Sequence, residues 1–159
     1  MPETPAFLAE RLKAEGEKTA AYFASLSEAQ WGTVVYTEGT TWTVRNVFAH
    51  VVTSERAFVK LFAQIQQGGP GSAEDFSIDR YNASQQRRTQ GLPPAELLDG
   101  FKAVRAEMAA WVAGLDPADL QREGRHPYLG PTTLAEMIKM VYRHDQIHLR
   151  DVRRGFEAA

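Results

Sequence analysis

Two histidines near the C-terminal end of the chain are spaced so that one metal ion could bind both. His144 and His148 are four residues apart, and on a helix such side chains are rotated by only about 40° and separated by about 6 Å along the axis. The chain has four histidines in all. Of the other two, His50 lies in a second segment with helical periodicity, whereas His126 lies in a loop flanked by proline and glycine. We therefore predict a metal site made of His50, His144 and His148, and we expect His126 to be an exposed loop residue.

Three imidazole ligands leave open positions on a metal ion, which is typical of a reactive site rather than a structural one. Such an ion can lower the pKa of a bound water toward ~7 for hydrolysis, or it can bind and deprotonate an external thiol. The chain contains no cysteine, so a thiol would have to come from a cosubstrate. Protease chemistry is disfavoured, because Asp145 directly follows the first histidine of the pair and no H-E-x-x-H motif is present. The alternative outside catalysis is a dimeric bundle whose metal is vestigial or absent.

Four segments have the apolar periodicity of helices and must position these residues. The second segment begins near Thr43, a residue suited to N-capping, and ends at the Gly-Gly-Pro sequence that starts at Gly68. The fourth begins at Thr133, whose spacing to Glu136 is that of a capping box. The expected helices cover about residues 5–26, 43–67, 93–114 and 133–154, with a short helix at 79–90 and a brief extended piece at 33–36.

The connection between the second and third helices, residues 67–94, is long, polar and interrupted by glycine and proline. We interpret it as a crossover that lets these two helices run parallel. The fourth helix, joined by the shorter connection 119–130, should then be antiparallel to the second. The sequence therefore predicts an all-α fold, a four-helix bundle that forms a single domain over residues 1–159.

This arrangement places the three histidines at the same height in the bundle. His50 is seven residues after Thr43, about 10 Å along the helix, and His148 is six residues before Arg154, about 9 Å. In antiparallel helices the start of one is level with the end of the other. The three imidazoles should therefore meet.

Two acids lie where packing residues would be expected. Glu55 falls close to the centre of the apolar stripe of the second helix, and Asp145 falls near the middle of that of the fourth. Each could accept a hydrogen bond from a ligand histidine and fix its tautomer. Alternatively, each could pair with an arginine inside the bundle. The sequence leaves both alternatives open.

Composition limits the functions to consider. With 43% hydrophobic and 24% charged residues, the chain has the composition of a soluble globular protein. No apolar run approaches the roughly 20 residues that span a membrane, and the first ten residues lack the pattern of a signal peptide, so we expect a cytoplasmic protein without a membrane partner. The net charge of −2 and the scattered arginines give no basic surface, so nucleic-acid binding is not expected.

Three short pieces of the sequence, in order, carry a family resemblance. They are residues 41–45 leading to His50, residues 79–82 in the crossover, and the fourth helix from Thr133 through His144 and His148. On these pieces nearly the whole chain resembles the DinB-like (YfiT-like) superfamily of metal-dependent four-helix bundles.

This resemblance implies an up-down-down-up bundle, a homodimer, and a divalent metal ion, zinc or nickel, on the residues that match the family's ligands, His50, His144 and His148. Some members of the family are transferases that use mycothiol, bacillithiol or glutathione. We therefore predict a divalent-metal-binding protein that acts on small molecules as a thiol-dependent transferase. The alternatives are a metal-dependent hydrolase and a non-catalytic dimeric bundle.

Overall fold

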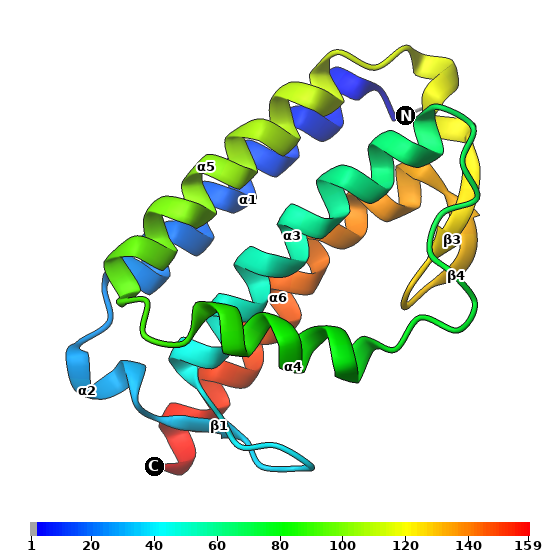
Figure 1. Ribbon diagram of the computed structural model, residues 1–159. Coiled ribbons are helices and arrows are strands. Elements are labelled where there is room, and N and C mark those ends of the chain that lie inside the picture. Colours follow the sequence, from blue (N-terminus) through cyan, green and yellow to red (C-terminus); the bar gives the residue numbers. More distant parts are fainter. Residues whose placement is uncertain (1–2) are drawn as a thin grey trace.

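Four long helices form the body of the computed structural model, which describes residues 3–159 (Figure 1). They are α1 (Pro5–Ala24), α3 (Val44–Gln66), α5 (Pro94–Ala113) and α6 (Leu134–Ala158). The shorter elements are α2 (Glu28–Trp31), α4 (Ile78–Thr89), the 3-10 helix η1 (Pro117–Gln121), and the strands β1 (Val34–Tyr36), β2 (Trp42–Thr43), β3 (Glu123–His126) and β4 (Gly130–Thr133). The predicted four-helix-bundle class is confirmed. No helix within the described range has an apolar stretch long enough to cross a bilayer.

The direction of the helices agrees with the predicted crossover. Figure 1 shows α3 and α5 running the same way, with α1 and α6 running opposite to them. The packing is consistent with this, because contacts between α3 and α5 advance together along both helices, from the Phe48–Phe101 ring pair to the Phe62–Trp111 pair. The crossover contains α4, which is held against α3 by a hydrogen bond from Asn46 Nδ2 to Gln86 Oε1 (3.0 Å).

Threonine caps begin the two helices that carry the candidate ligands. At α3, Thr43 Oγ1 accepts from the Asn46 N–H, and Asn46 Oδ1 accepts from the Thr43 N–H (2.8 Å), which completes a capping box. At α6 only half of the predicted box forms. Thr133 Oγ1 accepts from the Glu136 N–H (3.3 Å), but the Glu136 carboxylate accepts instead from Lys139 (2.6 Å).

The predicted connection 119–130 is more ordered than expected, because β3 and β4 pair in it as an antiparallel hairpin. The strand residues do not alternate between apolar and polar, so no periodic signal marks them. Packing and turn geometry explain the hairpin instead. A Cβ on Gly124 would lie 2.7 Å from Ile65 Cγ1, and Gly130 has a φ of 72°, which favours glycine.

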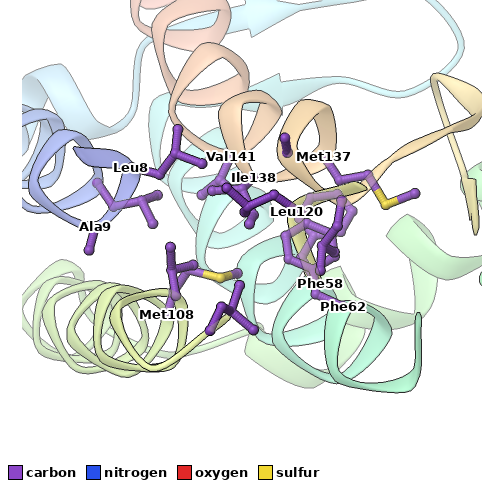
Figure 2. Packing of buried hydrophobic residues seen from close by; sticks show 14 of the residues in the cluster. Leu8, Ala9, Phe58, Phe62, Met108, Leu120, Met137, Ile138 and Val141 are labelled. Carbon is purple, nitrogen blue, oxygen red and sulfur yellow. The ribbon is translucent and has the colours of Figure 1, made fainter. Parts of the chain in front are cut away.

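Two apolar clusters fill the bundle. The first includes Leu12, Phe62, Met108 and Ile138, and Figure 2 shows part of it. The second is built around stacked aromatic rings, with 4.1 Å between the centroids of Phe23 and Phe48. Each long helix contributes to both clusters, so burial of their apolar faces holds the bundle together.

Buried polar residues lie between the two clusters along the helices, and we call them the polar layer. They are Thr53, Ser54, Glu55, Arg105, His144 and Asp145.

Arg105 is the centre of this layer. Its Nε and Nη2 donate to the two oxygens of Glu55 (2.9 and 2.8 Å), Nη2 also donates to Asp145, and Nη1 donates to the carbonyl of Leu12 (3.1 Å). A Cβ at Gly16 would lie 2.7 Å from Arg105 Cγ, so glycine provides the room for this side chain. One guanidinium on α5 therefore binds groups on the other three long helices.

We predict that Arg105→Met destabilises the protein by about 3–5 kcal/mol, because two buried carboxylates lose their counter-charge. Denaturant unfolding measures the change in the free energy of unfolding, and Lys102→Met, on the exposed side of α5, is the matched control. A loss of less than about 1 kcal/mol would contradict the role assigned to Arg105.

Candidate metal centre

The structure brings the three predicted ligands together. His50 Nε2 lies 3.1 Å from His144 Nε2, and His148 Nε2 lies 3.0 Å from the same atom. The three candidate ligand atoms all lie within 4.8 Å of one another. His50 and His144 are buried and His148 is partly buried. In the part of the chain that the structure describes, this is the one group of three or more such side chains with metal-binding spacing.

Hydrogen bonds behind the rings select the tautomer of His148. The hydroxyl of Tyr36 donates to Asp151 Oδ2 (2.6 Å) and lies 2.8 Å from His148 Nδ1. Since the one hydroxyl hydrogen is used on the carboxylate, the Tyr36 oxygen accepts a hydrogen bond from Nδ1–H. His148 Nε2 then carries a lone pair that faces the other imidazoles. Such a carboxylate-linked partner is typical of metal-binding histidines.

Ser54 plays a similar part behind His50, with its hydroxyl oxygen 3.3 Å from His50 Nδ1. The ring of Trp42 packs beside the same imidazole, 5.2 Å between centroids. Trp42 thus packs at the entry of α3, as expected for an aromatic residue at that position.

Burial keeps the three imidazoles neutral. It is the largest cause lowering the pKa of His50, His144 and His148, each to about 3. The charge of a neighbouring histidine acts in the same direction in every case. Asp151 opposes the shift at His148, and the Asn82 side chain opposes it at His50. At neutral pH the site therefore offers uncharged nitrogens, the form in which histidine binds metal.

The donor atoms fit a divalent transition-metal ion. Two nitrogens bound at about 2.1 Å to one ion lie roughly 3.0 Å apart at a bond angle of about 90°, and roughly 3.4 Å apart at the tetrahedral angle. The two nitrogen separations at His144, 3.0 and 3.1 Å, match the lower end of this range.

The two acids in the apolar stripes form ion pairs instead of fixing histidine tautomers. Glu55 and Asp145 both bond to Arg105, which is the ion-pair alternative left open by the sequence. Tyr36, which contacts the His148 ring, and Asp151, which accepts from the Tyr36 hydroxyl, are not apparent from periodicity. The only sequence signal is that Asp151 follows His148 by three residues, on the same side of the helix.

The prediction for His126 is wrong, because this residue is buried, with 1% of its surface exposed. Its ring stacks on Phe58 at 5.1 Å between centroids, and its Nδ1 accepts from the backbone N–H groups of Tyr128 and Leu129 (3.1 and 3.2 Å). These bonds close the turn of the β3–β4 hairpin. Burial lowers its pKa to about 4, and its Nε2 has no hydrogen-bond partner among residues 3–159.

A cavity of about 270 Å³ adjoins the histidine cluster. Ser54, which contacts His50, lines it, and so does Tyr128, whose ring centroid lies 6.0 Å from that of His144. Tyr81 and Asn82 of α4 complete the wall near the cluster, and the Tyr81 hydroxyl donates to the carbonyl of Thr53 (3.3 Å).

With this fold and this set of residues, the chain belongs to the DinB superfamily, whose family model matches residues 11–152. The resemblance found in the sequence is thereby confirmed. No curated protein matches the sequence.

Three solved structures show the same fold at low sequence identity. YfiT from Bacillus subtilis, described as a probable metal-dependent hydrolase with an unusual four-helix bundle topology, is 16% identical with a TM-score of 0.75, over 94% of this chain and 86% of that one. The colibactin self-resistance protein ClbS, described in complex with dsDNA, is 14% identical with a TM-score of 0.72, over 99% and 96%. A mutant of a mycothiol-dependent maleylpyruvate isomerase is 17% identical with a TM-score of 0.69, over 93% of this chain and 59% of that one. At these identities the similarity concerns the fold.

We predict that Tyr36→Phe weakens metal affinity by about 10–100-fold, because His148 loses the partner that fixes its tautomer. Competition titration of purified protein with a chromogenic chelator measures the affinity. Tyr22→Phe, at a tyrosine of α1 whose ring packs under Arg153, is the matched control and should leave affinity unchanged. Equal affinities for wild type and Tyr36→Phe would contradict this.

The histidine pKa values also predict how stability depends on pH in the metal-free protein. In the folded state the pKa values of His50, His144, His148 and His126 all lie below the usual 6.5. The unfolded chain therefore binds protons first, and stability, fully present above pH ~7, falls as the pH drops toward 5.

Each such histidine contributes a slope of up to about 1.4 kcal/mol per pH unit. Denaturant unfolding at pH 7.5, 6.5 and 5.5 with excess chelator tests this, and His126→Phe should flatten the curve by removing one of the groups. A free energy of unfolding that stays constant over this range would refute the buried neutral state.

Proposed function

We propose that this protein is a metal-dependent enzyme that acts on small molecules, with one divalent ion, zinc or nickel, held by His50, His144 and His148. The observation that carries the proposal is the convergence of three neutral imidazole nitrogens beside a cavity. Tyr36 and Asp151 support it further, because they orient His148 with its lone pair toward the other two rings.

Within this class we propose a thiol-dependent transferase, with a low-molecular-weight thiol as cosubstrate. When bound, the ion would supply a positive charge that holds the sulfur of an external thiol as a thiolate near neutral pH. The chain itself has no cysteine. In the transfer, the sulfur forms a bond to an electrophilic carbon of the second substrate, the bond from that carbon to its leaving group breaks with the electron pair going to the leaving group, and the thiol proton is released to solvent.

The chain's own side chains have separable parts in this reaction. The three histidines supply the nitrogen atoms that would bind the ion. Tyr36, together with Asp151, keeps the proton of His148 on Nδ1. No carboxylate joins the three-histidine group in the described chain. Three neutral nitrogens leave the full positive charge on a bound ion, and that charge would help to deprotonate an external thiol or a water molecule.

Metal-dependent hydrolysis is the second candidate, because the relative YfiT is described as a probable metal-dependent hydrolase. The thiol-dependent reading draws on the isomerase described as mycothiol-dependent, of which this chain spans 59%. The homodimer and the cytoplasmic location stay predictions. So does the absence of nucleic-acid binding, since ClbS is described with dsDNA.

We predict about one zinc or nickel ion per chain in protein purified without an affinity tag, and loss of the ion in His144→Ala, because His144 Nε2 lies next to both other ligand atoms. Elemental analysis after metal titration and desalting measures the stoichiometry. Tyr81→Phe, a change on the cavity wall, should keep the ion. Wild type that stays metal-free would overturn the metal site.

Cobalt-substituted protein tests the thiol. Adding mycothiol, bacillithiol, glutathione or cysteine should produce the charge-transfer absorption of a cobalt thiolate, which His144→Ala should lack. If cobalt binds and none of these thiols produces the band, the transferase proposal fails and the hydrolase remains.

A further inference from the structure

The walls of the cavity beside the histidines are almost entirely apolar. Rings and aliphatic side chains form most of them, from Phe58 and Leu61 of α3, Phe76 and Ile78 of the crossover, and Tyr128 of the hairpin turn. The polar side chains in the wall are all neutral: Ser54 and Asn82 lie next to His50, and the others are Gln64, Ser72, Tyr81 and Tyr128. No lysine, arginine, aspartate or glutamate lines the cavity.

The rim of the cavity exposes aromatic surface that a ligand would cover. Phe76 and Tyr128 are 42% and 46% exposed, although both line the cavity. Phe76 packs against Tyr81, 5.7 Å between ring centroids. Exposed aromatic rings gathered at a concave site are typical of places where apolar ligands bind.

Charges outside the wall give no net attraction for an anion or a cation. Asp79 raises the pKa of Tyr128, where burial is the larger cause, and Arg88 lowers that of Tyr81 against the effect of burial. The two charges are of opposite sign, and neither side chain lines the cavity. In the metal-free protein a charged ligand would therefore lose its hydration without gaining a counter-charge, which costs several kcal/mol.

Volume limits the size of the ligand. A dry cavity of ~150 Å³ takes up benzene, so the cavity of about 270 Å³ has room for one aromatic ring with a small substituent. Ser54 and Asn82 offer hydrogen bonds to a neutral polar group at the end near the histidines.

We propose that the second substrate of this enzyme is an uncharged, largely apolar molecule the size of a substituted benzene, bound in this cavity with its neutral polar group toward Ser54 and Asn82. The inference rests on the proposed function for its meaning as a substrate site. The selectivity of the cavity itself depends only on its walls.

Three compounds of nearly equal shape test the selectivity: neutral benzamide, anionic benzoate and cationic benzamidine. Binding to full-length protein is followed by titration in 1H–15N NMR spectra, with and without zinc. Benzamide should bind at least tenfold more tightly than either charged compound in the metal-free form, and more tightly than benzamidine in the zinc form as well. The metal-free protein has no ion for benzoate to bind, so the affinities measured there report on the cavity alone.

Ala57→Leu, in the wall, should weaken benzamide binding at least tenfold and leave metal stoichiometry unchanged. Ala21→Leu, in the groove between α1 and α5 on another part of the surface, is the matched control and should change neither. If Ala57→Leu does not fold, Ala73→Leu fills the same cavity from an exposed loop position.

Benzoate or benzamidine binding as tightly as benzamide in metal-free protein, or unchanged binding in a folded wall variant, overturns the proposal. Loss of metal binding alone would count against the proposed function and not against this site.

Discussion

The buried guanidinium of Arg105 is the constraint on which the helix arrangement depends. Removing a guanidinium and two carboxylates from water costs several kcal/mol per ion, and only close pairing repays it. Arg105 on α5 bonds to Glu55 on α3, Asp145 on α6 and a carbonyl on α1. These contacts exist in one axial alignment of the four helices. Apolar packing alone tolerates small shifts along a helix, whereas this network does not.

That alignment also sets the position of the ligands. Asp145 directly follows His144, and Glu55 lies five residues after His50. Fixing the two carboxylates on one guanidinium therefore fixes the heights of His50 and His144 relative to each other. Two neighbouring polar groups of different character thus lie inside the bundle. In the first, an arginine of the chain balances the acids. In the second, neutral imidazole nitrogens face one another at 3.0 and 3.1 Å. A proton on His144 Nε2 can form a hydrogen bond to only one of the two neighbouring nitrogens. A metal cation, in contrast, can bind the lone pairs of all three rings.

The helices, the crossover and the meeting of the three histidines could be predicted from the sequence because each depends on local regularities. Helical periodicity and threonine caps marked the elements, and the heights of His50 and His148 followed from counting residues along antiparallel helices. What escaped prediction depends on contacts distant in sequence. Tyr36 contacts His148 from a three-residue strand that is 112 residues away in the sequence, and the apolar periodicity gives no sign of such a contact. His126 was expected in solvent because proline and glycine flank it, yet its hairpin folds onto Phe58 and buries it. Glu55 and Asp145 were recognised as buried acids, but their partner Arg105 had no signal beyond its place on the inner face of α5.

The helices and the connecting segments contribute different parts of the candidate site. The candidate ligands come from α3 and α6, which the polar layer joins, whereas several side chains beside them come from connecting segments. Tyr36 and Trp42 come from the paired strands β1 and β2, and Tyr128 comes from the turn of the β3–β4 hairpin. Substitutions in these connections do not disturb the Arg105 network, so the substrate pocket can change while the donor atoms keep their positions. A fold built in this way can carry different activities, which agrees with the different descriptions given to proteins of the same fold. In this chain the connections supply aromatic rings and no charged side chain to the described cavity wall, and these residues, rather than the histidines, determine which small molecules fit beside the site.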